Sequence, residues 1–529
     1  MTDQTKYSKL PDIPCEKFEF VSCGERIADR KFEDKPVGYF RDAWNRFCRN
    51  KGSIAAACII LLIVMFAFSA PFFIHKYDSA FQDVYYAKKP ARNLLLSQIG
   101  IADGGTERDF SEKGLIKAAS VGMGAEDLEG TGNVTLKEGM ESYYQPVIDI
   151  RCSYQAAEIK GQEPRTIYEA RIDNYLEVGF MYRSIEQSEY EKILVWEKET
   201  GLRVLYPLIA ANEYNADSSD ANNWYKTKNG SPVSVDREGG TRKIEFGEDM
   251  ILEDNYRRDA EGNPVYFEYT GGGTAETAQY KVRVLYYNWY RYVNGFEPEY
   301  IFGTDSQGYD LALRMADGIR LSLLFALSMS AINLFLGAAV GALEGYYGGV
   351  FDIAAERVIE ILNGVPFMVT ATLFQLHLAA KVGVIPGLLF AFVLTGWTGM
   401  AGRTRTQFYR FKHQEYVIAA RTLGAGDSRI ILKHIFPNAI GTIITGGVLV
   451  IPGTINSEST LSYLGIVKLG TADTTSLGTL ISDAGSVWTT YPHLMIYPAL
   501  VLSLLMICFN LFGNGLRDAF NPALRGVEE

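Results

Sequence analysis

The chain has 529 residues with a formal net charge of −11, and 21% of its residues are charged. This acidity argues against nucleic-acid binding, and the charged fraction is too high for a protein that lies wholly within a membrane. No P-loop motif and no other catalytic motif occurs, so we expect no catalytic residues and no ATP hydrolysis in this chain. The few histidines and cysteines lack metal-ligand spacing, which predicts no metal site. Composition therefore favours a membrane protein with one large soluble part.

The first 51 residues are predicted to form a cytoplasmic tail, because three basic residues directly precede the first apolar run. Phe40, Trp44 and Phe47 are spaced four and three residues apart near the end of this tail. Such spacing predicts a short amphipathic helix that lies on the inner leaflet. The alternative is a disordered tail.

Six apolar runs without charged residues are long enough to cross a membrane. About 20 residues that each rise roughly 1.5 Å cross a hydrocarbon core of about 30 Å. The runs are 52–74 (52–76 with its flank), 321–343, 361–380, 382–402, 435–457 and 491–513. Lys and Arg are biased toward alternate loops, which predicts that both termini are cytoplasmic and that 458–490 lies outside. No run has a central charged residue, which favours a transporter powered from outside the membrane over an ion-coupled one.

Residues 77–300, between the first and second runs, differ from the rest of the chain. They hold 38 acidic and 25 basic residues, a net charge of −13, and many aromatic residues. This aromatic content is typical of a folded domain, and the topology places it outside the cell. An amphipathic helix is predicted at 188–200 with Gly201 ending it, and strands are predicted within 167–179 and 281–284. We therefore expect an inserted extracytoplasmic α+β domain.

A basic stretch at 401–438 separates the fourth and fifth runs and contains seven Lys and Arg residues. This charge predicts a cytoplasmic loop. Residues 415–423 are predicted to form a short helix that Gly424 ends in the left-handed conformation. Asp427 is then predicted to cap a second helix that runs to Pro437. On composition alone, a plain intracellular loop is the simpler interpretation.

The order of residues in this stretch is more specific. The sequence YVIAAR at 416–421, Gly424 and Ala425, and HIFPN at 434–438 resemble the "EAA" loop of importer-type ABC permeases. The narrower resemblance is to the dipeptide/oligopeptide/nickel permease family. Four further segments resemble that family in its order: GTDSQGYD at 303–310, GYYGG at 345–349, ESTLSYLG at 458–465 and NLFGNGLRD at 510–518.

The resemblance covers about 301–529 and is closest to the C-type permease subunit. Several features depart from the family pattern, among them His434 where the general motif has isoleucine and Ser476-Leu477-Gly478 where Ser-Trp-Gly is usual. Tyr309 stands where arginine is usual, Ile418 stands where the general motif has glutamate, and 77–300 has no counterpart.

The resemblance implies a membrane all-α core with the six transmembrane helices of the importer-type ABC permease fold, formed by 52–76 and 301–529. It implies a coupling loop at 403–437 that docks on an ATPase subunit. The candidate coupling residues are Glu415, Ala419, Ala420, Arg421, Gly424, Asp427 and Pro437. The implied partners are a B-type permease subunit, two ABC ATPase subunits, an extracellular solute-binding protein and a peptide substrate. ATP and Mg would bind to the ATPase subunits, with no cofactor in this chain.

Uncharged polar residues within the apolar runs are candidates for a translocation path: Asn333, Asn363, Gln375, Thr445 and Asn456. Hydrogen bonds between helices explain them equally well. Asp305 and Asp310 mark the extracytoplasmic mouth, although capping of a helix is the simpler role. Three other functions stay open: import of nickel or another small solute, a membrane receptor with an extracellular sensing domain, and a membrane-anchored enzyme.

Overall fold

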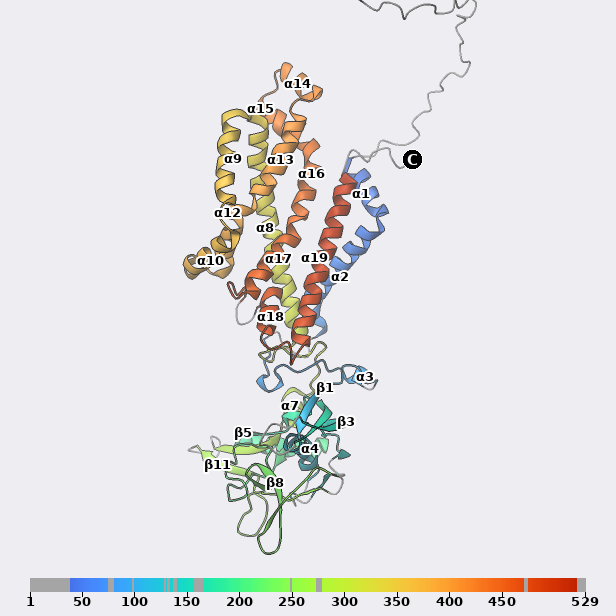
Figure 1. The fold of residues 1–529 in the computed structure, drawn as a ribbon, viewed down its shortest axis with the longest axis vertical. Helices are drawn as coiled ribbons and strands as arrows, with labels where there is room; N and C mark the ends of the chain where they lie inside the picture. Colours follow the sequence, from blue (N-terminus) through green and yellow to red (C-terminus); the bar gives the residue numbers. More distant parts are fainter. Residues whose placement is uncertain are drawn as a thin grey trace, which may run out of the picture.

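The computed structural model describes residues 39–520, with gaps at 75–79, 98, 128–129, 131–133, 137–139, 157–164, 248–249, 273–277 and 471–473. Most of the predicted N-terminal tail therefore lies outside the described residues. The described chain has a bundle of long helices at one end and a mixed α/β insert at the other (Figure 1).

The helical bundle comes from both ends of the chain. Its helices are α1 (Tyr39–Arg49), α2 (Lys51–Phe73), α8 (Leu311–Tyr347), α9 (Gly349–Asn363), α10 (Phe367–His377), α11 (Ala379–Val382), α12 (Val384–Gly396), α13 (Thr398–Phe411), α14 (Glu415–Thr422), α15 (Asp427–Arg429), a π-helical segment (Ile430–Ile435), α16 (Phe436–Val448), α17 (Val450–Tyr463), α18 (Leu477–Ala484) and α19 (His493–Phe520). Among the described residues, five helices are long and apolar enough to cross a membrane, or six if one bent pair is a single span.

That bent pair corrects the third predicted span, because 361–380 is not one helix. α9 and α10 meet at an angle of 75° across 364–366. Pro366 cannot continue the hydrogen-bonded ladder of α9, and it disfavours helical geometry at Val365 before it. Hydropathy detected the apolar run but not this break.

The helix after α14 is much longer than predicted. Instead of ending at Pro437, the chain from Asp427 to Tyr463 is apolar enough and continuous enough to count as one span. A π-helical segment at Ile430–Ile435 directly precedes Pro437. Because a π-turn shifts the hydrogen-bonding register, the chain passes the proline with its missing N–H near the start of α16.

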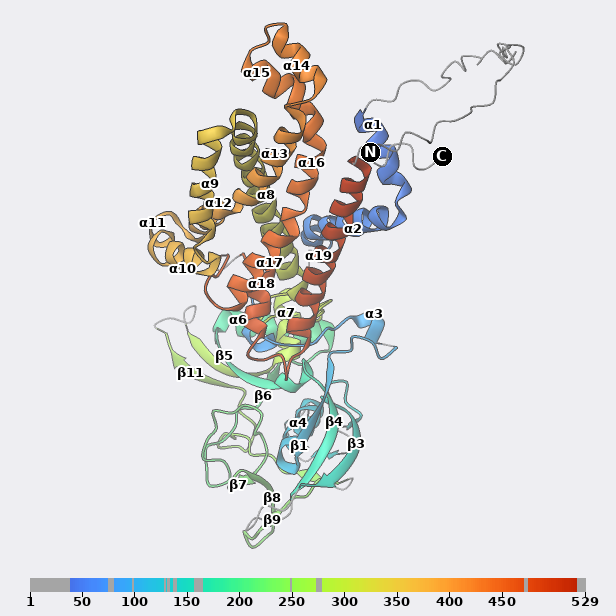
Figure 2. The ribbon, with the colours of Figure 1, turned by 45° about the horizontal axis from the view of Figure 1, so that its top comes forward.

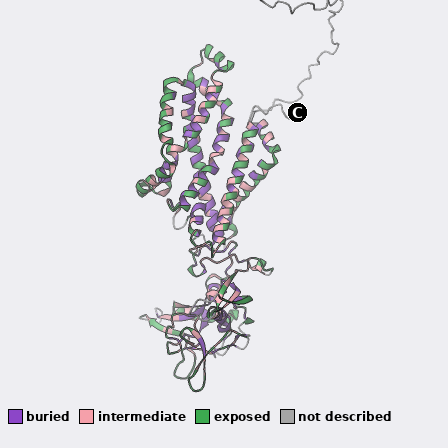
Figure 3. Cartoon of the chain, in the orientation of Figure 1, coloured by how far each residue is buried: buried purple, intermediate pink, exposed green. Residues whose placement is uncertain are grey.

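α8 lies at the centre of the bundle and packs closely on α13. A Cβ atom on Gly337 would lie 2.6 Å from Cβ of Met400, and one on Gly345 would lie 2.5 Å from Cβ of Phe408. Gly341, midway between them, faces the backbone of Ala401 equally closely. Glycine at every fourth position thus lets the two backbones approach. Buried residues concentrate along these two helices, whereas the outer face of α9 is exposed (Figure 3).

The predicted helix before the first span is present as α1. One of its apolar residues packs against the bundle, and another is exposed. Phe47 is buried, and its ring packs edge-to-face on Phe512 of α19 at 5.3 Å. Trp44 is 63% exposed. Only the Trp44 side of α1 is therefore free to lie in a lipid interface.

A probe attached to a Trp44→Cys variant is expected to report this lipid contact. An environment-sensitive fluorophore at position 44 should shift to the blue in membranes, and lipid-borne quenchers should reduce its emission. The same probe on an Arg49→Cys variant, whose site is also exposed, serves as the control. A fully aqueous, mobile probe at position 44 would contradict the interfacial placement.

The described residues of the insert form four small antiparallel sheets and several helices. Its elements are a 3₁₀ turn (Val84–Tyr86), α3 (Leu94–Ser97), β1 (Gly105–Ser111), α4 (Glu112–Glu126), β2 (Val134–Thr135), β3 (Val147–Gln155), β4 (Thr166–Asp173), a 3₁₀ turn (Leu176–Val178), β5 (Phe180–Glu186), α6 (Gln187–Thr200), β6 (Leu205–Tyr206), β7 (Thr227–Lys228), β8 (Ser231–Val235), β9 (Thr241–Lys243), β10 (Ile251–Leu252), β11 (Phe267–Gly271), β12 (Gln279–Leu285) and α7 (Tyr286–Asn294). The sheet orders are β1-β4-β3, β10-β2, β11-β12-β5 with β6 beside β12, and β7-β8-β9.

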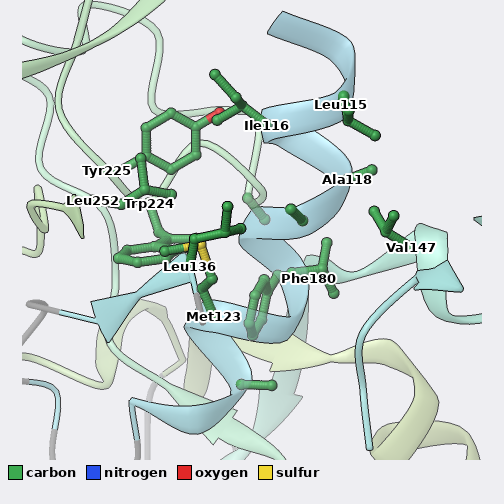
Figure 4. Close-up of a cluster of buried hydrophobic side chains, with 14 of the residues drawn as sticks. Leu115, Ile116, Ala118, Met123, Leu136, Val147, Phe180, Trp224, Tyr225 and Leu252 are labelled. Carbon is green, nitrogen blue, oxygen red and sulfur yellow. The ribbon is translucent and has the colours of Figure 1, made fainter. Parts of the chain in front are cut away.

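The predicted α+β elements are largely present. α6 ends at Gly201 in the left-handed conformation (φ 71°), and β12 contains 281–284. The strand predicted within 167–179 stops at Asp173, because the Asp173 carboxylate accepts hydrogen bonds from the N–H groups of Tyr175 and Leu176 and starts a turn. In one hydrophobic core, apolar side chains of α4 pack against the buried Trp224 (Figure 4).

A second core joins the insert to the bundle. Tyr86, Tyr286 and Tyr290 of the insert cluster with Ala70 of α2 and Leu313 of α8. The insert therefore packs on the end of the bundle that lies opposite α14 (Figure 2).

Residues 83–92, which lead into the insert, pair with residues 300–308, which lead out of it, and these two segments form the neck of the insert. The N–H of Asp83 donates to Gly308 O at 3.0 Å, and the N–H of Lys88 donates to Asp305 O at 2.9 Å. Arg92 and Tyr300 exchange both backbone hydrogen bonds at 2.9 Å. Because the two connections pair antiparallel, the insert behaves as one unit added to a single loop.

Candidate functional site

The residues predicted for coupling lie at the tip of the bundle farthest from the insert (Figure 2). Glu415, Ala419 and Arg421 are exposed on α14, and Leu423 after it is 88% exposed. Val417 on the other side of α14 is fully buried. It packs in a cluster with Phe408, Ile430 and Ile435. One face of α14 is thus held by the bundle, while the other is free to contact a partner.

Gly424 forms the predicted turn between α14 and α15. Its φ of 84° is left-handed, which confirms the glycine requirement. A Cβ atom at this position would meet nothing within 4 Å. Any side chain placed here would therefore project from the tip of the hairpin into open space.

Asp427 has a different role from the predicted one. The N-cap of α15 is Gly426, and Asp427 makes no capping hydrogen bond. Instead, the hydroxyl of Tyr346 donates to the Asp427 carboxylate at 2.5 Å and accepts from Arg421 Nη2 at 3.3 Å. Tyr346 belongs to the last turn of α8, so one phenol links the central helix to both arms of the α14–α15 hairpin. The sequence analysis noted this GYYGG segment only for its family resemblance and missed the role of Tyr346.

A Tyr346→Phe variant is expected to keep the fold and weaken the link between the hairpin and α8. Removing the hydroxyl deletes two hydrogen bonds to charged groups, which typically contribute about 1.5–3 kcal/mol each. If the hairpin has the coupling role that the family resemblance implies, ATP-driven uptake should fall at least several-fold, while the protein still inserts and folds with a moderately lower melting temperature. Tyr347→Phe, which alters the neighbouring exposed tyrosine, is the matched control. Equal uptake by both variants would exclude a coupling role for the Tyr346 hydroxyl.

A second group of polar contacts joins α9 to α13. The Arg405 guanidinium binds the Asp352 carboxylate through two hydrogen bonds of 2.6 and 2.9 Å, and it reaches Glu356 at 2.5 Å. The hydroxyl of Tyr409 adds a 2.6 Å bond to Asp352. A bidentate arginine pair fixes orientation as well as distance, so α9 is held in register with α13. The basic character of 401–438 was noted in the sequence, but the partners of Arg405 were not.

One of the predicted path residues borders a groove within the bundle. The groove has a volume of about 330 Å³ and is lined by Asn333 of α8, Phe367 of α10, Phe392, Thr395 and Gly396 of α12, and Val450, Gly453, Thr454 and Ser457 of α17. Asn333 is 2% exposed, and its side-chain carbonyl has no hydrogen-bond partner among the described residues. An unsatisfied amide oxygen beside hydroxyl and aromatic groups suits uncharged polar groups such as peptide amides.

The other predicted path residues are not brought together at this groove. Asn363 accepts a hydrogen bond from the Thr398 hydroxyl at 3.0 Å, and the Thr445 hydroxyl donates to Thr442 O at 3.0 Å. Asn456 is exposed and Gln375 is partly buried. The contacts of Asn363 and Thr445 are the local and interhelical hydrogen bonds that were their alternative interpretation.

Asp305 and Asp310 both organise the loop that leads into α8. The Asp310 carboxylate caps α8 by accepting from the N–H groups of Ala312 and Leu313 at 2.7 and 3.3 Å. Asp305 accepts from the N–H groups of Gln307 and Tyr309, and it lies 3.5 Å from Arg314. Burial raises the pKa of Asp310 to about 6 and raises that of Asp305 as well. Asp310 therefore has the capping role named above as the simpler alternative, whereas Asp305 binds backbone N–H groups of the loop that precedes α8.

Two buried glutamates were not among the candidates. Glu458 of α17 is 1% exposed and accepts hydrogen bonds from four serines: Ser322, Ser459, Ser462 and Ser476. These bonds join α8, α17 and the start of α18. Glu344 of α8 is fully buried, and neither of its carboxylate oxygens has a partner in the described part of the chain. The motif around Glu458 was visible in the sequence, but its serine partners are separated by up to 136 positions.

Comparisons with known proteins place these features in a family. Residues 333–526 match the model of the binding-protein-dependent transport system inner membrane component. Residues 38–93 match the N-terminal TM domain of oligopeptide transport permease C. Neither model covers 94–332, which includes nearly all of the insert.

Curated relatives agree with these models. The chain is 40% identical over 225 residues to the dipeptide transport system permease protein DppC of Lactococcus lactis subsp. cremoris, which covers 42% of this chain and 64% of that relative. It is 39% identical over 225 residues to the oligopeptide transport system permease protein OppC of Bacillus subtilis, covering 42% and 72%. The MetNI methionine ABC transporter in an inward-facing conformation is 14% identical, with a TM-score of 0.33 over 39% of this chain and 96% of that chain. That structural likeness is too weak to carry an argument.

The matched segments include α1, α2, the hairpin tip and the residues that line the groove beside Asn333. The apolar helices make the chain a multi-pass membrane protein. The chain therefore belongs to the dipeptide/oligopeptide permease family of binding-protein-dependent ABC importers.

Proposed function

We propose that this chain is the C-type permease subunit of an ABC importer for dipeptides or oligopeptides. The observation that carries the proposal is the α14–α15 hairpin, which lies inside the family-matched region with one face exposed and with Tyr346 joining it to α8. Such a hairpin can transmit movement of a bound partner into the centre of the bundle. The dipeptide and oligopeptide transport named for the relatives supports peptide as the substrate class.

The mechanism we propose is alternating access. The partners are a B-type permease subunit, two ABC ATPase subunits and an extracellular solute-binding protein. ATP and Mg bind to the ATPase subunits, and this chain supplies no chemistry. Closure of the two ATPase subunits moves the hairpin. Tyr346 transmits that movement to α8, and the Arg405–Asp352 pair transmits it to α9 and α13. The free energy for the change is the difference in nucleotide affinity between two states.

We further propose that both termini and the α14–α15 hairpin face the cytoplasm. Six helices would cross the membrane, counting the bent α9–α10 pair as one, and the insert would be extracytoplasmic. Seven Lys and Arg residues at 401–438, and the basic residues before α2, support this orientation. The groove bordered by Asn333 would then lie along the translocation path.

Uptake into proteoliposomes that contain all partner subunits tests the proposal. We expect ATP-dependent accumulation of a radiolabelled dipeptide or pentapeptide that disappears when this chain is omitted. Radioactive nickel, offered in the same vesicles, tests the small-solute alternative. Nickel accumulation without peptide accumulation would overturn the substrate class. Co-purification with a kinase instead of ATPase subunits would overturn the importer itself.

A further inference from the structure

A cavity at the junction of the insert and the bundle contains an arginine without a polar partner. The cavity has a volume of about 290 Å³ and is lined by residues of the neck, β5 and α7. Within the described part of the chain, Arg183 of β5 has no ion-pair partner, and its buried Nε has no hydrogen-bond partner. Polar groups that are buried normally find a partner, so the buried Nε of this half-buried arginine can donate to a group that is not part of the chain.

Aromatic rings hold Arg183 in place. Its guanidinium carbon lies 4.8 Å from the ring centre of Tyr85, 5.6 Å from that of Tyr286 and 5.8 Å from that of Trp289. Such stacking stabilises the cation through the ring faces but satisfies none of its N–H donors. The planar donor fork is therefore fixed in orientation and still free to bind an acceptor.

The one carboxylate in the lining does not occupy this fork. Asp83 is 6% exposed and accepts from the Tyr286 hydroxyl at 2.6 Å and from the N–H of Tyr85 at 3.0 Å. Burial raises the pKa of Asp83, while its hydrogen bonds and the nearby Arg183 act in the opposite direction. The Asp83 carboxylate is thus engaged by Tyr286 and the backbone of Tyr85, and no hydrogen bond joins it to Arg183 among the described residues.

The remaining lining is accessible and mixed in character, with the polar Gln82 and Asn294 beside aromatic and aliphatic side chains. Val84 and Val293 at the rim are 68% and 57% exposed, and Phe81 and Trp289 line the interior. An aromatic wall beside a single fixed cation is typical of a small-ligand site. The volume lies near the lower end of such sites, which suits one carboxyl-terminal residue rather than a long chain.

We propose that this cavity binds a terminal carboxylate joined to an aromatic or apolar side chain. The carboxylate accepts two parallel hydrogen bonds from the Arg183 guanidinium, and the side chain packs against Phe81 and Trp289. The neck places the cavity beside the start of α8, because Asp83 hydrogen-bonds to Gly308. On the proposed import function, on which this assignment of source rests, the ligand is the carboxyl-terminal residue of a peptide about to enter the bundle.

Calorimetry on the assembled transporter in nanodiscs, without the solute-binding protein, tests the site. The probes are the dipeptide Ala-Phe, its carboxyl-terminal amide and 3-phenylpropionate. We expect Ala-Phe to bind wild type, and we expect amidation or Arg183→Gln to weaken binding roughly 10- to 100-fold, the usual range for losing charged hydrogen bonds. Arg237→Gln, which alters an exposed arginine beyond the cavity, should bind like wild type.

The Arg183→Lys variant tests whether any loss of binding comes from a disturbed structure rather than from the missing hydrogen bonds. It keeps a cation among the rings without the bidentate fork, so we expect intermediate affinity and a melting temperature close to that of wild type. Equal binding of acid and amide, or unchanged binding by Arg183→Gln, would overturn the site. If 3-phenylpropionate binds as tightly as Ala-Phe, the source is a small aromatic acid, and tighter binding of Ala-Phe identifies a peptide. If the wild-type transporter binds Ala-Phe but takes up no peptide, the proposed import function is wrong and the proposed binding site stands.

Discussion

A Gly424→Asp variant is expected to insert and fold normally but to lose most ATP-driven uptake. Gly424 has a φ of 84°, and a side chain there would contact nothing within this chain. Its backbone strain is only about 1–2 kcal/mol, which is too small to unfold the bundle. The added carboxylate would project from the hairpin tip, where a docked ATPase subunit would have to desolvate it. Uptake and permease-stimulated ATPase activity, measured in proteoliposomes, should both fall by an order of magnitude or more.

Two neighbouring variants separate the causes. Gly424→Ala imposes the backbone strain without the charge, and we expect it to retain most activity. Gly426→Asp adds the same charge two residues away, at φ −71° and at the N-cap of α15, where an aspartate is favourable. If Gly424→Asp transports as well as Gly426→Asp, the tip of the hairpin does not dock closely on a partner.

The sequence predicted those parts of the molecule that follow from local chemistry. Apolar runs identified α2, α8 and α19, and glycine chemistry identified the ends of α6 and α14. The bend between α9 and α10 was missed because hydropathy averages over Pro366. Asp427 was assigned to a cap because the N-cap preference is local. Its actual partner, Tyr346, is 81 positions away in the sequence.

In the candidate site too, features set by neighbouring residues were predicted, and features that combine distant segments were not. Residues of the α14–α15 hairpin were found through their order in the chain, which a family motif preserves. The groove beside Asn333 and the serines around Glu458 each combine several helices, so no single segment reveals them. Polar residues within apolar runs form hydrogen bonds between helices as readily as they line a path, and composition alone does not separate the two.

Replacing the insert by a tight turn is expected to leave the permease core assembled and to weaken capture of the solute-binding protein. Arg92 and Tyr300 exchange both backbone hydrogen bonds, so residues 93–299 can be replaced by Asn-Gly, the preferred two-residue hairpin turn. The insert lies at the end of the bundle opposite α14, and the segment 77–300 carries a net charge of −13. A field of this sign accelerates association with a basic surface and loses strength as salt rises.

Binding of the solute-binding protein should therefore be measured over a range of ionic strengths, on nanodiscs that hold the complete transporter. For wild type we expect affinity and association rate to fall steeply between about 50 and 500 mM salt, because the Debye length shortens over that range. For the shortened chain we expect weaker capture with a shallower salt dependence, while both ATPase subunits still co-purify. The alternative is that the insert is a spacer that contacts only its permease partner. Under that alternative, capture and its salt dependence would match those of wild type, and the docking role would be abandoned.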